Sequence, residues 1–465
     1  MSAVLSELTA PVERPVLSIL RERGATPAPA TPDPLALVGA ELAAPLVFGG
    51  AVRYANFDYA ASAPCLVAAK EAVEVALPWY SSVHRGAGYA SHVTTRRYER
   101  CRASVRRFLG ARPDDVVLFT RNTTDSLNLL AHALPAGTTV VVFETEHHAS
   151  LLPWDGHPVL RLPAPASPAD AVTAVADALR GCPDGPRLVC VTGASNVTGE
   201  LWPVADLAQV AHAHGARIAL DAAQLAPHAP LDVATLDVDY VAFSGHKLYA
   251  PFGVGVLAGR PDWLAAADPY LRGGGASREV RADEVIWADL PARQEAGTPN
   301  VLGAIALAAA CDALDAADRW RLAAEEGELL RRLRRGLARI PGVHELALFD
   351  PDHPRVGIVA FTVDGWDCGR LSAALSAEYG IGVRDGLFCA HPFVRHLTSS
   401  NAGNCAGTAV RASLGLGTTA EDVDRLVDAV ATLVRGGARW AYRQVGGVYE
   451  PTPDPRPWPV DVASG

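Results

Sequence analysis

Six short and almost uninterrupted apolar runs, separated by amphipathic segments, constrain the fold of this chain more than any other feature. The runs are "DVVLFT" (115–120), "TVVVFE" (139–144), "RLVCVT" (187–192), "ARIALD" (216–221), "VDYVAFS" (238–244) and "GVGVLAG" (253–259). Strands that are buried on both faces read as continuous apolar runs rather than as alternating ones. Segments with helical periodicity stand among them, at 124–134 and 204–215. The pattern therefore predicts an α/β fold with a mostly parallel sheet covered by helices on both faces.

The pattern changes near Asn300, where a long helical stretch begins that is expected to reach about Ile340. Two further apolar runs, "VGIVAFTV" and "GIGVRDG", and a helix over 420–434 follow it. We predict a large α/β domain (49–303) and a smaller C-terminal α+β domain (304–440). An N-terminal extension with a Pro/Ala linker (1–48) and a Pro-rich, extended C-terminal tail (441–465) flank them.

Composition excludes several classes of function. The 465 residues carry a formal net charge of -10 and no long Lys/Arg run, which argues against nucleic acid as a partner. Two arginine-rich segments, 94–108 and 329–340, are interpreted as solvated helix faces. The eight cysteines include no CxxC pair, so no metal site is predicted. Without a signal peptide or an apolar stretch of about 20 residues, we expect a cytoplasmic protein with free thiols and no membrane span.

Polar residues cluster where the predicted strands end, which is the edge at which α/β sheets bind their ligands. They are Asp221 and Gln224 after one strand, Ser244, His246 and Lys247 after the next, Asn196 after "RLVCVTGAS", His147 and His148 after "VVVFETE", and Asn122, Thr123 and Thr124 at the start of a helix. Taken singly, each is most simply a cap, a turn residue or a surface group. Their joint occurrence at successive strand ends is the informative feature.

Pyridoxal phosphate is the one cofactor that accounts for this set. It needs a lysine for covalent attachment, a carboxylate for its ring nitrogen, a flat group against its ring and donors for its phosphate. Lys247 and Asp221 supply the first two, and the imidazole of His147 suits the third. The helix that begins near Thr124 offers backbone N–H groups and hydroxyls to a phosphate.

The stretch "DAAQLAPHAPLDVATLDVDYVAFSGHKLYAPFGVGVL" resembles the class V aminotransferase family of fold type I, and within it the SUF-type cysteine desulfurases and the related selenocysteine lyases. The resemblance covers roughly residues 54–435. It rests on separated motifs in family order: "FDYAASAP", "VHRGAGYASHVTTRRYE", "FTRNTTDSLNLLA", "EHHASLLPW", "SNVTGE", "SGHK" and "EAGTPN". It implies the fold of a type I pyridoxal-phosphate-dependent transferase, with a seven-stranded sheet in the large domain.

The resemblance also implies a role for each matching residue. Lys247 carries the cofactor and moves the substrate's α-proton, Asp221 pairs with its ring nitrogen, and His147 stacks on its ring. The remaining cofactor contacts are Asn196 and Gln224 at the ring hydroxyl and Thr123, Thr124, Ser244, His246 and Thr298 at the phosphate. Thr298 reaches across from a second subunit, which implies a homodimer. The substrate contacts are Arg411, Arg384 and, in "FDYAASAP", Ala60.

Cys389 in "VRDGLFCAHP" takes the position of the family's nucleophilic cysteine. The implied reaction removes sulfur from L-cysteine, or from a derivative of it, as a Cys389 persulfide and releases L-alanine. A sulfur-acceptor protein is then an expected partner. Alternatively, Cys389 has no catalytic role and only fills a small apolar space in an irregular loop. The enzyme is then a C–S or C–Se lyase, an epimerase or an aminotransferase of the same family, and a third possibility is a binding protein that has lost catalysis.

The chain departs from the family pattern around the substrate rather than around the cofactor. Phe388 stands where these enzymes usually carry histidine, and Gln294 stands where an aromatic residue is usual. The segment 391–409 is longer than the family's link to its arginine, and "SLGLGTTAED" replaces the family sequence after "RAS". A specialised sulfur donor and a lyase acting on a modified cysteine both fit these differences.

Overall fold

The computed structural model describes residues 33, 35–399 and 407–459, and the described residues from 35 onward belong to one compact unit. Most of the predicted N-terminal extension, Cys405 and the last six residues lie outside the described residues. Among those described, no helix combines the length and the apolar composition that a membrane span requires.

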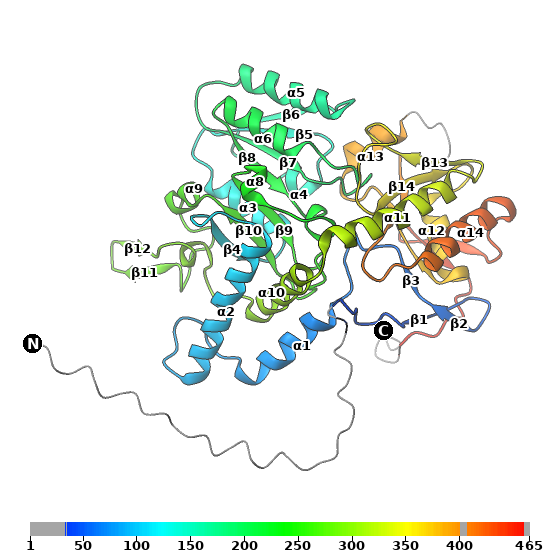
Figure 1. Cartoon of the computed structure of the whole chain (residues 1–465), viewed down its shortest axis with the longest axis horizontal. Helices are drawn as coiled ribbons and strands as arrows, with labels where there is room; N and C mark the ends of the chain where they lie inside the picture. The colour runs from blue at the N-terminus through cyan, green and yellow to red at the C-terminus, as the bar shows by residue number, and fades with distance from the viewer. Residues whose placement is uncertain (1–32, 34, 400–406, 460–465) are drawn as a thin grey trace, which may run out of the picture. The chain divides into compact units, whose positions relative to one another are not determined.

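A seven-stranded sheet forms the larger part of the described chain (Figure 1). In spatial order its strands are β4 (Val116–Thr120), β10 (Gly255–Gly259), β9 (Tyr240–Ser244), β8 (Arg217–Asp221), β7 (Arg187–Thr192), β5 (Thr139–Phe143) and β6 (Val159–Leu162). All neighbours pair in parallel except β10, which runs antiparallel to β4 and to β9. The prediction of an α/β fold with a mostly parallel sheet is confirmed.

Alternate side chains of each strand enter two different apolar clusters, because successive residues of a strand point to opposite faces. One face packs against α1 (Val67–Ala76), α2 (Tyr89–Phe108), α5 (Pro168–Gly181), α6 (Val204–Ala213) and α10 (Val301–Ala316). The other packs against α3 (Thr123–Ala133), α4 (His148–Leu151) and α9 (Pro261–Ala266). Short helices α7 (Leu225–His228) and α8 (Val233–Leu236) and the turns η1 (Leu77–Trp79) and η2 (Ala292–Gln294) complete this part.

The helical stretch expected from about Asn300 to Ile340 is two helices, α10 and α11 (Arg319–Leu337). The break follows from Asp318, whose side chain accepts a 3.0 Å hydrogen bond from the backbone N–H of Arg321 and so begins a new helix. In Figure 1, α11 leads from the end of α10 to the C-terminal part of the chain.

A smaller antiparallel sheet forms that C-terminal part, in the order β13 (Val343–Leu346), β14 (Ile358–Val363), β17 (Ala409–Ser413) and β16 (Arg384–Gly386). One face packs against α11, α12 (Cys368–Tyr379) and α14 (Ala420–Gly436). The other face packs against α13 (His391–Thr398), against Phe388 and against Val197. Val197 follows β7, so this second face ties the small sheet to the large one.

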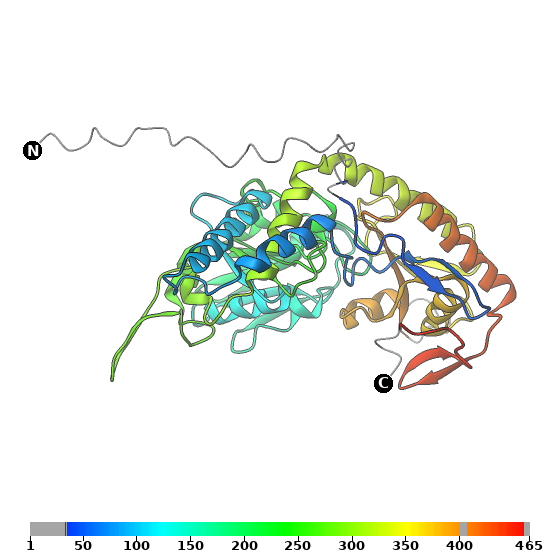
Figure 2. The same ribbon diagram turned by 90° about the horizontal axis from the view of Figure 1, so that it is seen from below.

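Three small hairpins and a short pairing complete the structure. The hairpins are β1 (Ala43–Pro45) with β2 (Ala51–Arg53), β11 (Ser277–Val280) with β12 (Val285–Trp287), and β18 (Tyr442–Val445) with β19 (Val448–Pro451). β3 (Ala55–Asn56) pairs in parallel with β15 (Ile381–Gly382). The hairpin β11–β12 projects away from the rest of the molecule (Figure 2). The hairpin β18–β19 occupies part of the segment expected to be an extended tail.

The hairpin β18–β19 forms because Glu378 anchors its start. This carboxylate accepts hydrogen bonds from the backbone N–H groups of Arg439 and Trp440, at 3.0 and 3.1 Å, and from the hydroxyl of Tyr442 at 3.1 Å.

The interpretation of 94–108 as a solvated helix face is wrong for Arg102, whose side chain is only 9% exposed. Its guanidinium donates to Glu295 Oε1 at 2.8 Å and to Oε2 at 3.0 Å. Glu295 also accepts from the hydroxyl of Tyr98 at 2.8 Å and from the backbone N–H of Phe119 at 2.7 Å. A buried charge requires such partners, and here they fix Glu295 against α2 and β4.

Candidate active site

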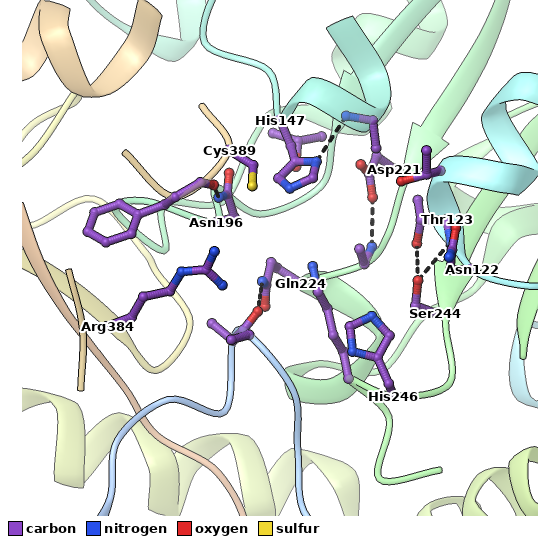
Figure 3. A pocket seen from close by; sticks show the side chains of 18 of the residues that line it. Asn122, Thr123, His147, Asn196, Asp221, Gln224, Ser244, His246, Arg384 and Cys389 are labelled. Carbon is purple, nitrogen blue, oxygen red and sulfur yellow. Dashed lines mark hydrogen bonds between the residues drawn. The ribbon is translucent and has the colours of Figure 1, made fainter. Parts of the chain in front are cut away.

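A cavity of about 220 Å³ opens at the carboxyl edge of the large sheet, where the small sheet meets it (Figure 3). Its walls include Ala60, Thr123, Thr124, His147, Asn196, Asp221, Gln224, Ser244, His246, Lys247, Arg384, Cys389 and Arg411. Of the residues that the sequence nominates for the site, all line this cavity except His148 and Thr298. Thr298 is exposed and borders a different cavity, with Tyr98 and Phe119.

Asp221 ends β8 and is 4% exposed. Its Oδ2 accepts a 2.7 Å hydrogen bond from the hydroxyl of Ser150, and its Oδ1 accepts one of 2.9 Å from the backbone N–H of Ala223. These two bonds fix the plane of the carboxylate. The sequence did not single out Ser150, although it stands within "EHHASLLPW", because a serine inside a short helix carries no distinguishing pattern.

Lys247 stands in the turn that follows β9, and its side chain extends into the cavity. Burial lowers the pKa of this amine to about 8, while the negative charge of Asp221 opposes the shift. A substantial fraction of the amine is therefore neutral near pH 8, which is the state in which it acts as a nucleophile or accepts a proton.

His147 caps the N-terminus of α4 with its ring, since Nδ1 accepts a 3.0 Å hydrogen bond from the backbone N–H of Ala149. Burial lowers the pKa of this imidazole to about 3, and the nearby positive charge of Lys247 adds to the effect. The ring is thus neutral at physiological pH. Its remaining proton lies on Nε2, because Nδ1 is the acceptor.

The start of α3 forms one end of the cavity. The side chain of Asn122 accepts from the backbone N–H of Asp125 at 3.0 Å and thereby begins the helix. Beside it, the backbone N–H of Thr123 donates to Ser244 Oγ at 2.7 Å, and the two hydroxyls are 2.6 Å apart. Such a helix N-terminus with clustered hydroxyls suits a phosphate dianion. Burial lowers the pKa of the neighbouring His246 to about 4, so this imidazole is neutral near pH 7.

Two amides line the middle of the cavity. Gln224 donates from Nε2 to the carbonyl of Ala60 at 2.8 Å, and its buried Oε1 has no partner among the described residues. Asn196 donates from Nδ2 to the carbonyl of Phe388 at 2.8 Å. An unpartnered buried acceptor is costly, so Gln224 Oε1 fits a hydroxyl or another donor on a ligand.

Two arginines and one aspartate form the side of the cavity that belongs to the small sheet. Arg411, on β17, is 2% exposed and donates to the carbonyl of Asn196 at 2.9 Å and to Asp58 Oδ1 at 3.2 Å. Burial lowers the pKa of Arg411 to about 10, so its guanidinium stays charged at pH 7. Arg384, on β16, is the cross-strand partner of Arg411 and also lines the cavity. With one carboxylate against two guanidinium groups, this side carries a net positive charge that favours an anionic ligand.

Cys389 lies at the mouth of the cavity, and its thiol is the exposed one among the free cysteines of the described chain. In Figure 3 its sulfur lies near the ring of His147. The carbonyl of Cys389 accepts a 2.8 Å hydrogen bond from the backbone N–H of His148. The thiol therefore has access both to the cavity and to solvent.

Comparison with known proteins places this geometry in a family. The profile described as "Aminotransferase class-V" matches residues 55–426. A cysteine desulfurase of Dickeya dadantii is 37% identical over 387 residues, which are 80% of this chain and 90% of that protein. A probable cysteine desulfurase of Vibrio cholerae is 35% identical over 363 residues, which are 75% of this chain and 86% of that protein.

Solved structures agree with the sequence relatives. The crystal structure of a cysteine desulfurase from Escherichia coli aligns with a TM-score of 0.72 and 34% identity, covering 82% of this chain and 95% of that one. An apo structure of a cysteine desulfurase from Thermococcus onnurineus aligns with a TM-score of 0.73 and 31% identity over the same shares.

The profile match, the relatives and the arrangement of Lys247, Asp221 and His147 around one cavity agree with one another. The chain therefore belongs to the class V aminotransferase family, whose enzymes depend on pyridoxal phosphate.

Proposed function

We propose that this chain is a cysteine desulfurase that transfers the sulfur of L-cysteine to Cys389 and releases L-alanine. The observation that carries the proposal is the position of Cys389. Its exposed thiol lines the same cavity as Lys247 and Asp221, beside two arginines suited to a carboxylate. The names of the relatives support the same reaction.

The residues of the cavity fit pyridoxal phosphate. Lys247 would hold it covalently, Asp221 would face its ring nitrogen, and His147 would lie against its ring. The hydroxyls of Thr123, Thr124 and Ser244 and the start of α3 suit its phosphate, and the unpartnered Gln224 Oε1 suits its hydroxyl. When bound, the cofactor supplies an electron sink that stabilises negative charge at the substrate α-carbon.

The chain's own groups orient the amino acid and move its proton. Arg411 and Arg384 bind the substrate carboxylate, and so turn its side chain toward Cys389. The amine of Lys247, with its pKa lowered to about 8 by burial, takes the proton from the α-carbon and returns it to carbon later. The neutral ring of His147 excludes water from one side of the reacting atoms.

The sulfur step forms one bond and breaks one. The Cys389 thiolate attacks the sulfur of the substrate, an S–S bond forms, and the bond between that sulfur and the substrate β-carbon breaks. The electron pair of the broken bond stays with the carbon skeleton, which takes up a proton and leaves as alanine. Cys389 is left as a persulfide at an exposed position, where a thiol or a sulfur-acceptor protein can reach the outer sulfur.

Product analysis tests the proposal. The enzyme loaded with pyridoxal phosphate is incubated with L-cysteine, with and without dithiothreitol, and alanine, pyruvate, ammonia and sulfide are measured. Cys389→Ala should lose sulfide and alanine production but retain the cofactor's absorbance. Formation of pyruvate and ammonia by the wild type, or full alanine production by Cys389→Ala, contradicts the proposal. The first outcome indicates a C–S lyase of the same family.

We further propose that the enzyme acts as a homodimer in which Thr298 of each subunit completes the phosphate site of the other. Thr298 is exposed and does not line the cavity of its own chain. The stretch of chain that holds the exposed aromatic residues Trp79, Tyr80 and Tyr89 lies beside the segment that holds Thr298, since Arg85 donates to the carbonyl of Gly297 at 3.5 Å. Exposed aromatic side chains beside Thr298 offer apolar area for a contact with a second subunit. Light scattering on the holoenzyme should give about twice the mass of one chain, and Thr298→Ala should weaken cofactor binding without changing that mass. A monomeric holoenzyme contradicts this proposal.

A further inference from the structure

The backbone at the nucleophile is held in an unusual conformation. Phe388 and Cys389 have φ angles of 49° and 56°, so two consecutive residues with side chains lie in the left-handed region. A bulky residue there is uncommon, because its Cβ crowds the neighbouring carbonyl. Such a conformation persists only where the surroundings determine it. The turn therefore has to be held by contacts outside itself.

Hydrogen bonds from the large sheet's connections supply part of that restraint. Asn196 Nδ2 donates to the carbonyl of Phe388 at 2.8 Å, and the backbone N–H of His148 donates to the carbonyl of Cys389 at 2.8 Å. The backbone N–H of His391 lies 3.4 Å from Nε2 of the same His148. Both carbonyls of the left-handed pair are thus fixed, one by Asn196, which lines the cavity, and the other by His148, whose neighbour His147 lines it.

The side chain of Phe388 supplies the rest. It is 3% exposed and packs into an apolar cluster beneath the small sheet. The other members of this cluster are Val197, Leu346, Ala360, Ala390, Phe393, Val394 and Ala409. The guanidinium of Arg411 lies 5.1 Å from the centre of its ring. One side chain therefore contacts the apolar core on one side and a residue of the cavity on the other.

We propose that Phe388 is a positioning residue, whose buried ring holds the turn so that the Cys389 thiol faces the cavity. The side chain of Phe388 points into the apolar cluster, whereas the side chain of Cys389 points toward the mouth of the cavity. Asn196 and His148 hold the backbone carbonyls of these two residues. The turn is then a rigid support rather than a mobile arm. The consequence for catalysis rests on the proposed desulfurase function, whereas the rigidity of the turn does not.

The test compares Phe388→Ala, which removes the ring, with Phe388→Leu, which retains apolar volume. Leu346→Ala is the matched control, since Leu346 is 3% exposed in the same cluster but does not line the cavity. Hydrogen exchange of the peptide spanning 386–391 is followed in the protein with and without pyridoxal phosphate. Alanine production from cysteine gives kcat and KM, and thermal unfolding gives stability.

In Phe388→Ala we expect faster exchange in 386–391 and a kcat about 10- to 100-fold lower, since a thiol misplaced by about 1 Å loses rate of this order. KM should change by less than about twofold, because the arginines that bind the carboxylate remain. Phe388→Leu should recover most of the rate. Leu346→Ala should lower the melting temperature while leaving kcat and the exchange of 386–391 near their wild-type values.

Unchanged exchange and unchanged kcat in Phe388→Ala overturn the proposal. An equal loss of kcat in Leu346→Ala also overturns it, because the effect is then one of general stability. If Phe388→Ala does not fold, Phe388→Leu is compared with the wild type by the same two measurements. Faster exchange in 386–391 together with a small fall in kcat supports the proposal, and no change in either overturns it. If the wild type releases no alanine, the proposed function fails, and the exchange of 386–391 still decides whether Phe388 holds the turn.

Discussion

The hydroxyl of Ser150 donates a 2.7 Å hydrogen bond to Oδ2 of Asp221, and both groups are buried at the edge of the large sheet. Ser150 lies in α4, two residues after His148, so the short helix that His147 caps also orients the carboxylate. Removing the hydroxyl leaves a buried charged acceptor with one partner fewer.

We predict that Ser150→Ala weakens binding of pyridoxal phosphate about 10-fold, because loss of one hydrogen bond to a charged group is worth roughly 1.5 kcal/mol. Titration of the cofactor-free protein, followed by absorbance, measures this. Ser91→Ala is the control, since the Ser91 hydroxyl is also buried but donates to the carbonyl of Ser82 at 2.7 Å, outside the cavity. Equal affinities for wild type and Ser150→Ala contradict the prediction.

The lowered pKa of Lys247 predicts a pH dependence of stability in the cofactor-free protein. The folded amine has a pKa of about 8 against 10.5 for the ordinary group, so between these values the unfolded chain binds more protons. The free energy of unfolding should therefore rise with pH through this window, by up to about 3 kcal/mol. Below pH 8 the amine is charged in the folded protein, and the full cost of burying that charge lowers the free energy of unfolding.

Urea unfolding at several pH values from 7 to 11 measures this, with Lys247→Met as the reference in which the buried charge is absent. The difference in stability between variant and wild type should shrink as the pH rises. A difference that stays constant across the window shows that the amine is not desolvated in the folded protein.

The contact between the hydroxyls of Thr123 and Ser244 predicts that removing one of them weakens binding of the cofactor's phosphate group in particular. Ser244→Ala removes the hydroxyl that lies 2.6 Å from that of Thr123. We expect affinity for pyridoxal phosphate to fall about 10-fold while affinity for pyridoxal, which has no phosphate, is nearly unchanged. Ser126→Ala is the control, because its buried hydroxyl lies in the same helix α3 but outside the cavity. If Ser244→Ala loses affinity equally for pyridoxal phosphate and for pyridoxal, the Ser244 hydroxyl does not bind the phosphate and the prediction is wrong.

The buried pair of Arg102 and Glu295 predicts a large effect on stability. Glu295→Gln removes the buried carboxylate and leaves the Arg102 guanidinium with Glu99, 3.2 Å from Nε, as its charged partner, at a cost of roughly 3 kcal/mol in the free energy of unfolding. The exposed pair of Arg107 and Asp312 offers a comparison on the same helix α2, and Asp312→Asn should cost less than about 1 kcal/mol. Urea unfolding of the three proteins decides, and similar losses for both variants contradict the prediction.

The sequence predicted the strands well wherever a strand is buried on both sides. The expected runs at 187–192 and 139–144 match β7 and β5 within one residue. It missed β6 (Val159–Leu162), because this edge strand pairs only with β5 and two of its four residues, Leu160 and Arg161, are exposed. Without a continuous apolar run, such a strand cannot be distinguished from a loop.

The site could be predicted as a set of residues but not as a network of contacts. Strand ends meet at one edge, so Asp221 and Lys247 were expected near each other. The bond of Asn196 to the Phe388 carbonyl joins residues 192 positions apart. It depends on how the small sheet docks, which no local pattern encodes. Arg102 was misread for the same reason, since its partner Glu295 lies 193 positions away.

The cavity draws its polar side chains from two separate stretches of chain. The groups suited to the cofactor stand between Thr123 and Lys247, whereas Arg384, Cys389 and Arg411 come from the small sheet and its connections. Mutation can therefore alter the two sets independently during evolution. Exchange of residues around Cys389 can then change the substrate or the sulfur acceptor while the residues suited to the cofactor stay the same.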